Sequence, residues 1–194
     1  QQKRRVGLSY LQKAAQQLLK NKQLNRELRF ILELAELLHH WGDLETALKL
    51  TMAALAIEPA NAAALNNHAL YLSRLNRFKE AFDFASKACG LSPTIPAYQN
   101  MLAIIEAQLN RLPEAKQRFQ RVIALSNDQQ QTSRAWQALV DVLDKLQEYD
   151  QAFAACLQAK ACYRQLPEMQ HHDGMQVLTA IQTNQQGFDA SLLN

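Results

Sequence analysis

One short segment recurs four times along this chain, and its spacing constrains the fold more than any other feature. The copies occupy residues 42–47, 76–81, 110–115 and 147–152, and read GDLETA, NRFKEA, NRLPEA and QEYDQA. Their closing alanines are separated by 34, 34 and 37 residues, and Pro59 and Pro93 share the 34-residue spacing. A fixed period of this length is typical of architectures in which small supersecondary units stack on one another.

Each unit is predicted to contain two helices. In residues 28–40 the apolar side chains recur at i, i+3, i+4 and i+7, which places them on one face of a helix (Ile31, Leu34, Ala35 and Leu38). A short polar turn follows, and a second apolar stripe runs from Ala47 to Ile57. Pro59 ends that second helix and Asn61 is a plausible N-cap for the next one. Pro96 and Pro113 fall where the first turn of a helix tolerates a missing N–H.

Composition agrees with a helical protein. Five Gly and five Pro among 194 residues are too few for the frequent turns of an all-β fold. No apolar run approaches the roughly 18 residues of a membrane span, and a net charge of +3 is too small to argue for nucleic acid or an anionic membrane. Three cysteines without a CxxC spacing favour a reducing compartment, and we expect a cytoplasmic protein.

Across about residues 28–166 the chain resembles the tetratricopeptide repeat (TPR) family, whose pattern is W-x2-L-G-x2-Y, then A-x3-F, then P. The match is best at small residues, where helices approach closely: Ala35, Ala69 and Ala103 in the first helices, and Ala47, Ala81, Ala115 and Ala152 in the second. It is looser where Thr51 and Ala85 replace a preferred Phe, which Phe119 keeps.

The resemblance implies an all-α, right-handed solenoid that forms a single domain over residues 1–194. The repeats would span 28–61, 62–95, 96–132 and 133–166. Residues 8–27 would form an N-terminal helix or half-repeat, and 167–194 a C-terminal capping helix and tail. We expect the three extra residues near 128–131 to widen a polar loop in the third unit.

The sequence indicates no catalytic or metal site and no cofactor. His39-His40 and His171-His172 are adjacent pairs, whose side chains diverge by about 100° on a helix and cannot chelate together. His68 stands where the other units have leucine, so we expect it to be a packing residue. Cys156 falls in a core position of the repeat, without an identifiable orienting His. We therefore expect a protein that is not an enzyme.

Binding is the function that the resemblance implies, because in that family the first helix of each unit lines a concave groove that holds peptides or partner helices. Asn66, Asn100 and Gln137 occupy equivalent places in three successive units, and a row of carboxamides suits the main chain of an extended peptide. A solvated polar surface is the alternative in a chain so rich in Gln. The predicted groove residues are Arg29, Glu36, His39, Asn66, Asn67, Asn100, Ile104, Arg134, Gln137 and Asp141.

Some members of the family hold the acidic C-terminus of Hsp70 or Hsp90 in a clamp of Lys, Asn and Arg. The corresponding places here hold Leu32, Glu36, Asn67, Ala97 and Met101. Only Asn67 fits, and the Glu36 carboxylate would repel another carboxylate. We therefore expect a protein or peptide partner other than the Hsp70 or Hsp90 C-terminus, and neither nucleic acid nor a membrane.

Two further hypotheses concern what the repeats are part of. Residues 133–166, with Tyr149-Asp150-Gln151-Ala152-Phe153, look like the last repeat before the catalytic domain of bacterial TPR-containing sulfotransferases. That resemblance implies an N-terminal recognition or targeting arm of a larger enzyme. Self-association is the other possibility, because an exposed terminal repeat face is adhesive wherever a cap is missing.

Overall fold

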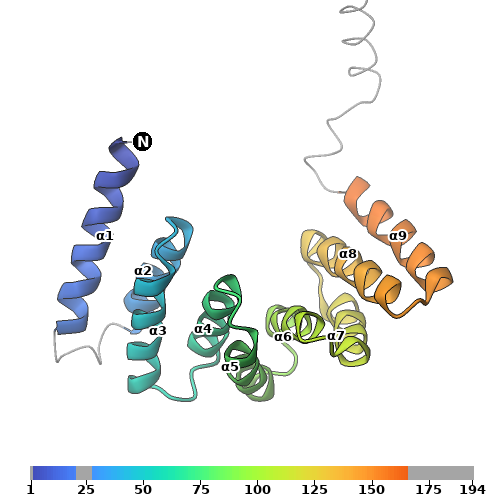
Figure 1. Cartoon of the computed structure of the whole chain (residues 1–194), viewed down its shortest axis with the longest axis horizontal. Helices are drawn as coiled ribbons and strands as arrows, with labels where there is room; N and C mark the ends of the chain where they lie inside the picture. The colour runs from blue at the N-terminus through green and yellow to red at the C-terminus, as the bar shows by residue number, and fades with distance from the viewer. Residues whose placement is uncertain (1, 21–27, 166–194) are drawn as a thin grey trace, which may run out of the picture.

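The computed structural model describes residues 2–20 and 28–165, which form helices joined by short turns with no strand among them. The helices follow one another in chain order along an arc (Figure 1). Their bounds are α1 Gln2–Lys20, α2 Leu28–His40, α3 Leu44–Ile57, α4 Ala62–Arg74, α5 Phe78–Leu91, α6 Pro96–Gln108, α7 Leu112–Leu125, α8 Gln129–Lys145 and α9 Tyr149–Arg164.

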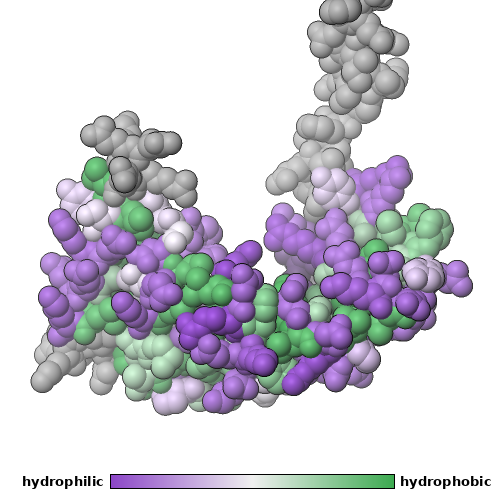
Figure 2. Space-filling model, in the orientation of Figure 1, coloured by the Kyte–Doolittle hydropathy of each residue, from purple (hydrophilic) through white to green (hydrophobic). Residues whose placement is uncertain are grey.

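The helices pack in pairs, and each pair packs on the next. The units are α2–α3, α4–α5, α6–α7 and α8–α9, and α3, α5 and α7 contact the first helix of the following unit. This is the arrangement in which no unit buries its apolar face alone and neighbours share a continuous core. Polar side chains cover most of the face seen in Figure 2, with apolar ones showing between them along the body of the arc.

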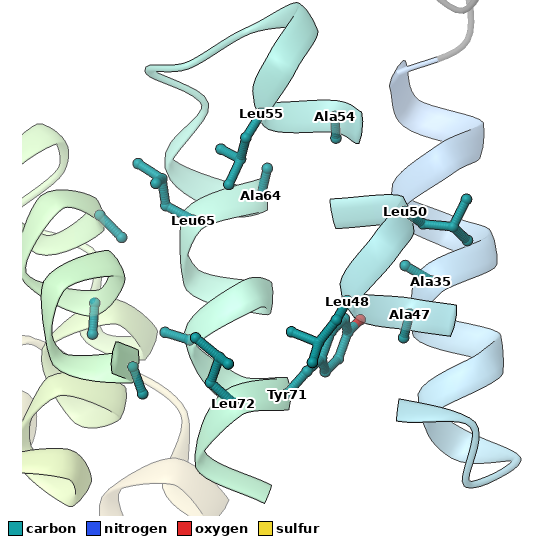
Figure 3. Close-up of a cluster of buried hydrophobic side chains, with 14 of the residues drawn as sticks. Ala35, Ala47, Leu48, Leu50, Ala54, Leu55, Ala64, Leu65, Tyr71 and Leu72 are labelled. Carbon is teal, nitrogen blue, oxygen red and sulfur yellow. The ribbon is translucent and has the colours of Figure 1, made fainter. Parts of the chain in front are cut away.

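Alanines let the two helices of a unit approach closely. Ala35 of α2 and Ala47 of α3 are fully buried at the contact between these helices, with Leu50 and Leu48 nearby (Figure 3). Ala81 and Ala115 are buried to the same extent in the following units. A larger side chain at these positions would force the helix axes apart, because protein interiors are closely packed.

The turn inside each unit has the same backbone geometry in all four copies. Gly42, Asn76, Asn110 and Gln147 all have positive φ angles, between 58° and 89°. The N–H of the next residue donates to the carbonyl five residues back, as Asp43 does to Leu38 at 2.9 Å. This is the Schellman helix ending, which needs one left-handed residue. The repeated sequence segment therefore encodes a repeated turn.

Helix starts also follow sequence signals. The side chains of Asp43 and Asn61 accept from the N–H three residues ahead and cap α3 and α4. Pro96 and Pro113 lie in the first turns of α6 and α7, as expected.

The expectation of a widened polar loop near residues 128–131 is wrong. Asp128 caps α8 by accepting from the Gln130 N–H, and the three glutamines that follow are helical. The extra residues therefore lengthen α8 to 17 residues, against 13 in α2, α4 and α6. Glutamine is a good helix former, so a capped glutamine run extends the helix that it precedes.

The first helix packs against the first unit. It begins at Gln2, earlier than the expected Leu8, and contacts α2 and α3. Gln12 Nε2 donates to Asp43 Oδ2 at 2.7 Å. The helix expected after Pro167 and the pair His171-His172 lie outside the described residues.

Candidate functional site

The amide row, which comprises Asn66, Asn100 and Gln137, comes from the first helices of three successive units. Asn66 lies on α4, Asn100 on α6 and Gln137 on α8. Asn66 and Asn100 are half-buried, and Gln137 is exposed. None of the three side chains hydrogen-bonds to another residue in the described part of the chain. The donors and acceptors of Asn100 and Gln137 are therefore free to bond to a ligand or to water.

Asn66 differs from the other two because its Oδ1 atom is fully buried. Among the described residues this is the one buried side-chain oxygen or nitrogen without a hydrogen-bond partner. A buried, unpaired polar atom destabilises a protein by about 1–3 kcal/mol. Any rearrangement that brings a hydrogen-bond donor to this oxygen would therefore stabilise the protein.

At the N-terminal end of the row, His39 lies against the next unit. Its ring stacks on that of Tyr71, with centroids 5.1 Å apart and the planes at 29°. Burial lowers the pKa of His39, the positive charges of His40 and Arg74 add to this, and Glu36 opposes it. Burial, together with the negative charge of Glu36, raises the pKa of the Tyr71 phenol. The structure thus brings Glu36 and His39 together beside α4.

The other four predicted residues do not contact one another. The Arg29 side chain is 92% exposed and donates to Glu33, one turn along the same helix, at 2.8 Å. A surface pair of this kind contributes little stability. Asn67 is half-buried, and Arg134 is exposed on α8. Ile104 packs against the core of the C-terminal half, so it belongs partly to the interior.

At the C-terminal end, Gln137 and Asp141 line one hollow of about 340 Å³ between α8 and α9. Val140 and Ala159 supply apolar wall, while Lys160 and Tyr163 add an ammonium and a phenol. The hollow therefore combines an apolar surface with groups that recognise polar or charged side chains. Sequence analysis found the contribution of α8 and missed that of α9.

Cys156 also lines this hollow, and its thiol is exposed. The expectation that Cys156 is a core residue is therefore wrong. In the first three units the equivalent position is covered by the following helix pair, whereas α9 is the last described helix. Cys89 is buried, as its apolar surroundings predict, and burial raises the pKa of its thiol.

The described residues hold no group of three or more His, Cys, Asp or Glu side chains that could bind a metal ion. No helix among residues 2–20 and 28–165 is long and apolar enough to cross a membrane.

Two buried polar residues have side-chain partners; the sequence analysis noted His68 only as a packing residue and missed Glu106. His68 bonds to Thr51, and Glu106 bonds to Arg118, both inside the stack. The signal already noted for His68 was also available for Glu106, because leucine occupies the positions equivalent to each of them in the other three units. A polar residue at a position that is leucine in the other units indicates a role besides core packing.

Solved structures of other proteins share this fold. MamA from Desulfovibrio magneticus is 13% identical and superposes with a TM-score of 0.64, covering 82% of this chain and 97% of that one. BtubC from P. vanneervenii is 18% identical with a TM-score of 0.70, covering 88% and 76%. The second TPR of RPAP3, bound to the HSP90 peptide SRMEEVD, is 22% identical with a TM-score of 0.51, covering 54% and 96%.

No protein-family model matches the sequence, and no curated protein matches it. The structural likenesses establish the fold, which is the expected all-α, right-handed solenoid of TPR helix pairs. The resemblance to the N-terminal arm of sulfotransferases is not shown by these comparisons and stays a prediction.

Proposed function

We propose that this chain is a noncatalytic scaffold that binds an extended segment of a partner protein along α2, α4, α6 and α8. The observation that carries the proposal is the amide row, with three unbonded carboxamides at equivalent places in successive units. Asn100 and Gln137 each offer both a donor and an acceptor to a peptide main chain, whereas Asn66, whose Oδ1 atom is buried, offers its N–H donors. The peptide-bound structure of the RPAP3 repeat supports the proposal, since it shows that the fold accommodates such a ligand.

The residues beside the amide row suggest which side chains the ligand carries. Arg29 and Arg134 are equivalent in the first and last units, and alanine holds that place in the middle two. Glu36 and Asp141 are likewise equivalent, with Leu70 and Ile104 between them. The surface is therefore charged at both ends and apolar in the middle. A segment with apolar residues flanked by charged ones is the complementary ligand.

Selection from a displayed peptide library, followed by calorimetric titration of the selected peptide, tests the proposal. The double variant Asn66→Ala/Asn100→Ala should weaken binding by roughly 25-fold, because a neutral hydrogen bond contributes about 1 kcal/mol and two are removed. The matched control is Gln120→Ala/Gln151→Ala, which removes two exposed amides from α7 and α9. Full affinity in the first variant, or an equal loss in the control, would show that the amide row is only a solvated surface.

The peptide SRMEEVD is the negative control for ligand class. We propose that it binds weakly or not at all, because Glu36 stands exposed where a clamp needs a cation, and Ala97 and Met101 offer none. Tight binding that weakens with added salt would contradict this proposal.

Self-association has its own test. Tyr149, Phe153 and Leu157 form an exposed apolar stripe on α9. Light scattering over a range of concentrations, with Phe153→Glu as the comparison, measures whether this stripe joins two copies.

A further inference from the structure

A second hollow, of about 500 Å³, opens among α3, α4 and α5, and no residue of the amide row lines it. Leu48, Met52, Leu72 and Phe84 form its apolar wall. Exposed charged residues stand at its rim, two acidic and two basic: Glu45, Lys49, Arg77 and Glu80. Its volume lies within the roughly 300–1,000 Å³ of small-molecule sites. The rim is balanced in charge, which favours a neutral ligand.

His68 is the one lining residue that is both polar and buried, with 5% of its surface exposed. Its Nδ1 lies 2.7 Å from the Thr51 hydroxyl oxygen. The same hydroxyl lies 3.1 and 3.0 Å from the carbonyl oxygens of Ala47 and Leu48 on its own helix, and when its single proton points to them its oxygen accepts from His68 Nδ1–H. In this tautomer Nε2 keeps a lone pair that can accept a hydrogen bond.

His68 lines the hollow, and its Nε2 atom is the ring nitrogen that Thr51 does not contact. Nε2 has no hydrogen-bond partner within the described residues. Among their side-chain oxygen and nitrogen atoms only Asn66 Oδ1 is both buried and unpaired. Nε2 is therefore not fully buried. Burial lowers the pKa of His68 to about 4, with the charge of Arg77 adding to the effect and Glu80 opposing it. The ring is therefore neutral at pH 7 and can accept a hydrogen bond.

Packing alone does not explain this histidine. Leu34, Leu102 and Leu139 hold the same place in the other units and are buried there. A leucine would also leave the Thr51 hydroxyl satisfied by its two helix carbonyls. The fold thus needs no imidazole at this position.

We propose that this hollow binds a phenol group, whose ring packs on the apolar wall and whose hydroxyl donates to His68 Nε2. Phe84 already lies against His68, with ring centroids 4.4 Å apart and planes at 58°, so an aromatic ligand joins an existing aromatic pair. In this tautomer a carboxylate is a poor ligand, because it has no proton to donate to the Nε2 lone pair. An aliphatic alcohol would fill less of the wall.

The test is an NMR titration of the full chain with p-cresol, toluene and 4-methylanisole. These probes share the ring, but only p-cresol can donate a hydrogen bond. We expect p-cresol to bind at least fivefold more tightly than either of the others, with amide shifts centred on Thr51, His68 and Phe84. N-acetyltyrosinamide distinguishes the source of the phenol: tighter binding than p-cresol indicates a tyrosine of a partner, and weaker binding a free small phenol.

The variant His68→Leu, which copies the other three units, should fold and bind all three probes equally. The matched control His40→Leu changes an exposed histidine of α2 and should keep the preference for p-cresol. Equal binding of p-cresol and toluene by the unchanged protein, a preference that survives in His68→Leu, or shifts confined to other surfaces would each overturn the proposal. None of these results bears on the amide row, which a different ligand tests.

Discussion

The pair formed by Glu106 and Arg118 gives the sharpest quantitative prediction. Glu106 is 2% exposed, and Arg118 Nε donates to both of its carboxylate oxygens, at 2.9 and 2.7 Å. Arg118 Nη1 also donates to Gln99 Oε1 at 3.2 Å. Burial raises the pKa of the Glu106 carboxyl in spite of the opposing effect of Arg118. Burial therefore disfavours the ionised carboxylate inside the stack, and the Arg118 guanidinium provides the main opposing effect.

Replacing Arg118 by Met should destabilise the protein by about 3 kcal/mol at pH 7. Breaking a buried ion pair from one side costs roughly 3–5 kcal/mol. Protonation sets a ceiling, because neutralising an ordinary glutamate at pH 7 takes about 3.7 kcal/mol. The same variant should lose only about 1 kcal/mol at pH 4.5, where the carboxyl protonates readily.

The double variant Glu106→Leu/Arg118→Met separates pairing from packing. Glu106→Leu alone should cost about 1 kcal/mol, because the Arg118 side chain is 29% exposed and keeps some water. The double variant should also cost only about 1 kcal/mol, which reflects the Gln99 oxygen left without its donor. The coupling energy is then about 3 kcal/mol, since the two separate losses do not add.

Urea unfolding followed by circular dichroism and by tryptophan fluorescence measures these energies, and the two signals must coincide before a two-state analysis applies to a repeat protein. A loss below 1 kcal/mol in Arg118→Met, or additive effects in the double variant, would refute the idea that the pair acts as a unit.

Three further predictions rest on single side chains. The pKa of His68 falls to about 4 in the fold, so this residue binds fewer protons in the folded state than in the unfolded state. Its contribution of about 3 kcal/mol to the free energy of unfolding should therefore be present above pH 6.5 and be lost as the pH falls toward 4. Calorimetry should not find this pH dependence in His68→Leu. Gly7→Ala should lower the melting temperature, since an added Cβ would lie 2.7 Å from the Trp41 ring, whereas Gly90→Ala meets open space and should raise it. Gln147→Gly should add about 1 kcal/mol to the free energy of unfolding, measured in urea, because Gln147 has a φ of 61°; no gain would mean that this turn is unstrained.

The repeat made most of the fold predictable. The segment that recurs four times predicted the helix pairs, and the left-handed turn residues recur at the same place within it. The start of α8 was missed because a run of glutamines is polar and was taken for a loop, although Asp128 before it is a helix cap. Local polarity and helix propensity point in different directions there, and the cap decides between them.

The candidate site was predictable only as a set of equivalent positions. The sequence places Asn66 and Asn100 one repeat apart, but it does not show that the oxygen of Asn66 is buried without a partner. Nor does it show that Gln137 and Asp141 share a hollow with α9. Such facts depend on how neighbouring units pack, and a repeat pattern fixes the register of a residue without fixing its contacts.

Glu106 and His68, which replace leucines of the repeat, differ in whether the fold satisfies their polar atoms. Glu106 is matched inside the stack: Arg118 bonds to both of its oxygens and Gln99 bonds to Arg118. His68 is matched on one side only, because Thr51 bonds to Nδ1, whereas Nε2 has no partner among the described residues and the ring lines the hollow. A polar group that the fold satisfies completely can be exchanged, with its partner, for apolar side chains at little cost. A buried polar group with one unused atom at a cavity is better explained by a ligand, and in this chain that reasoning points to His68.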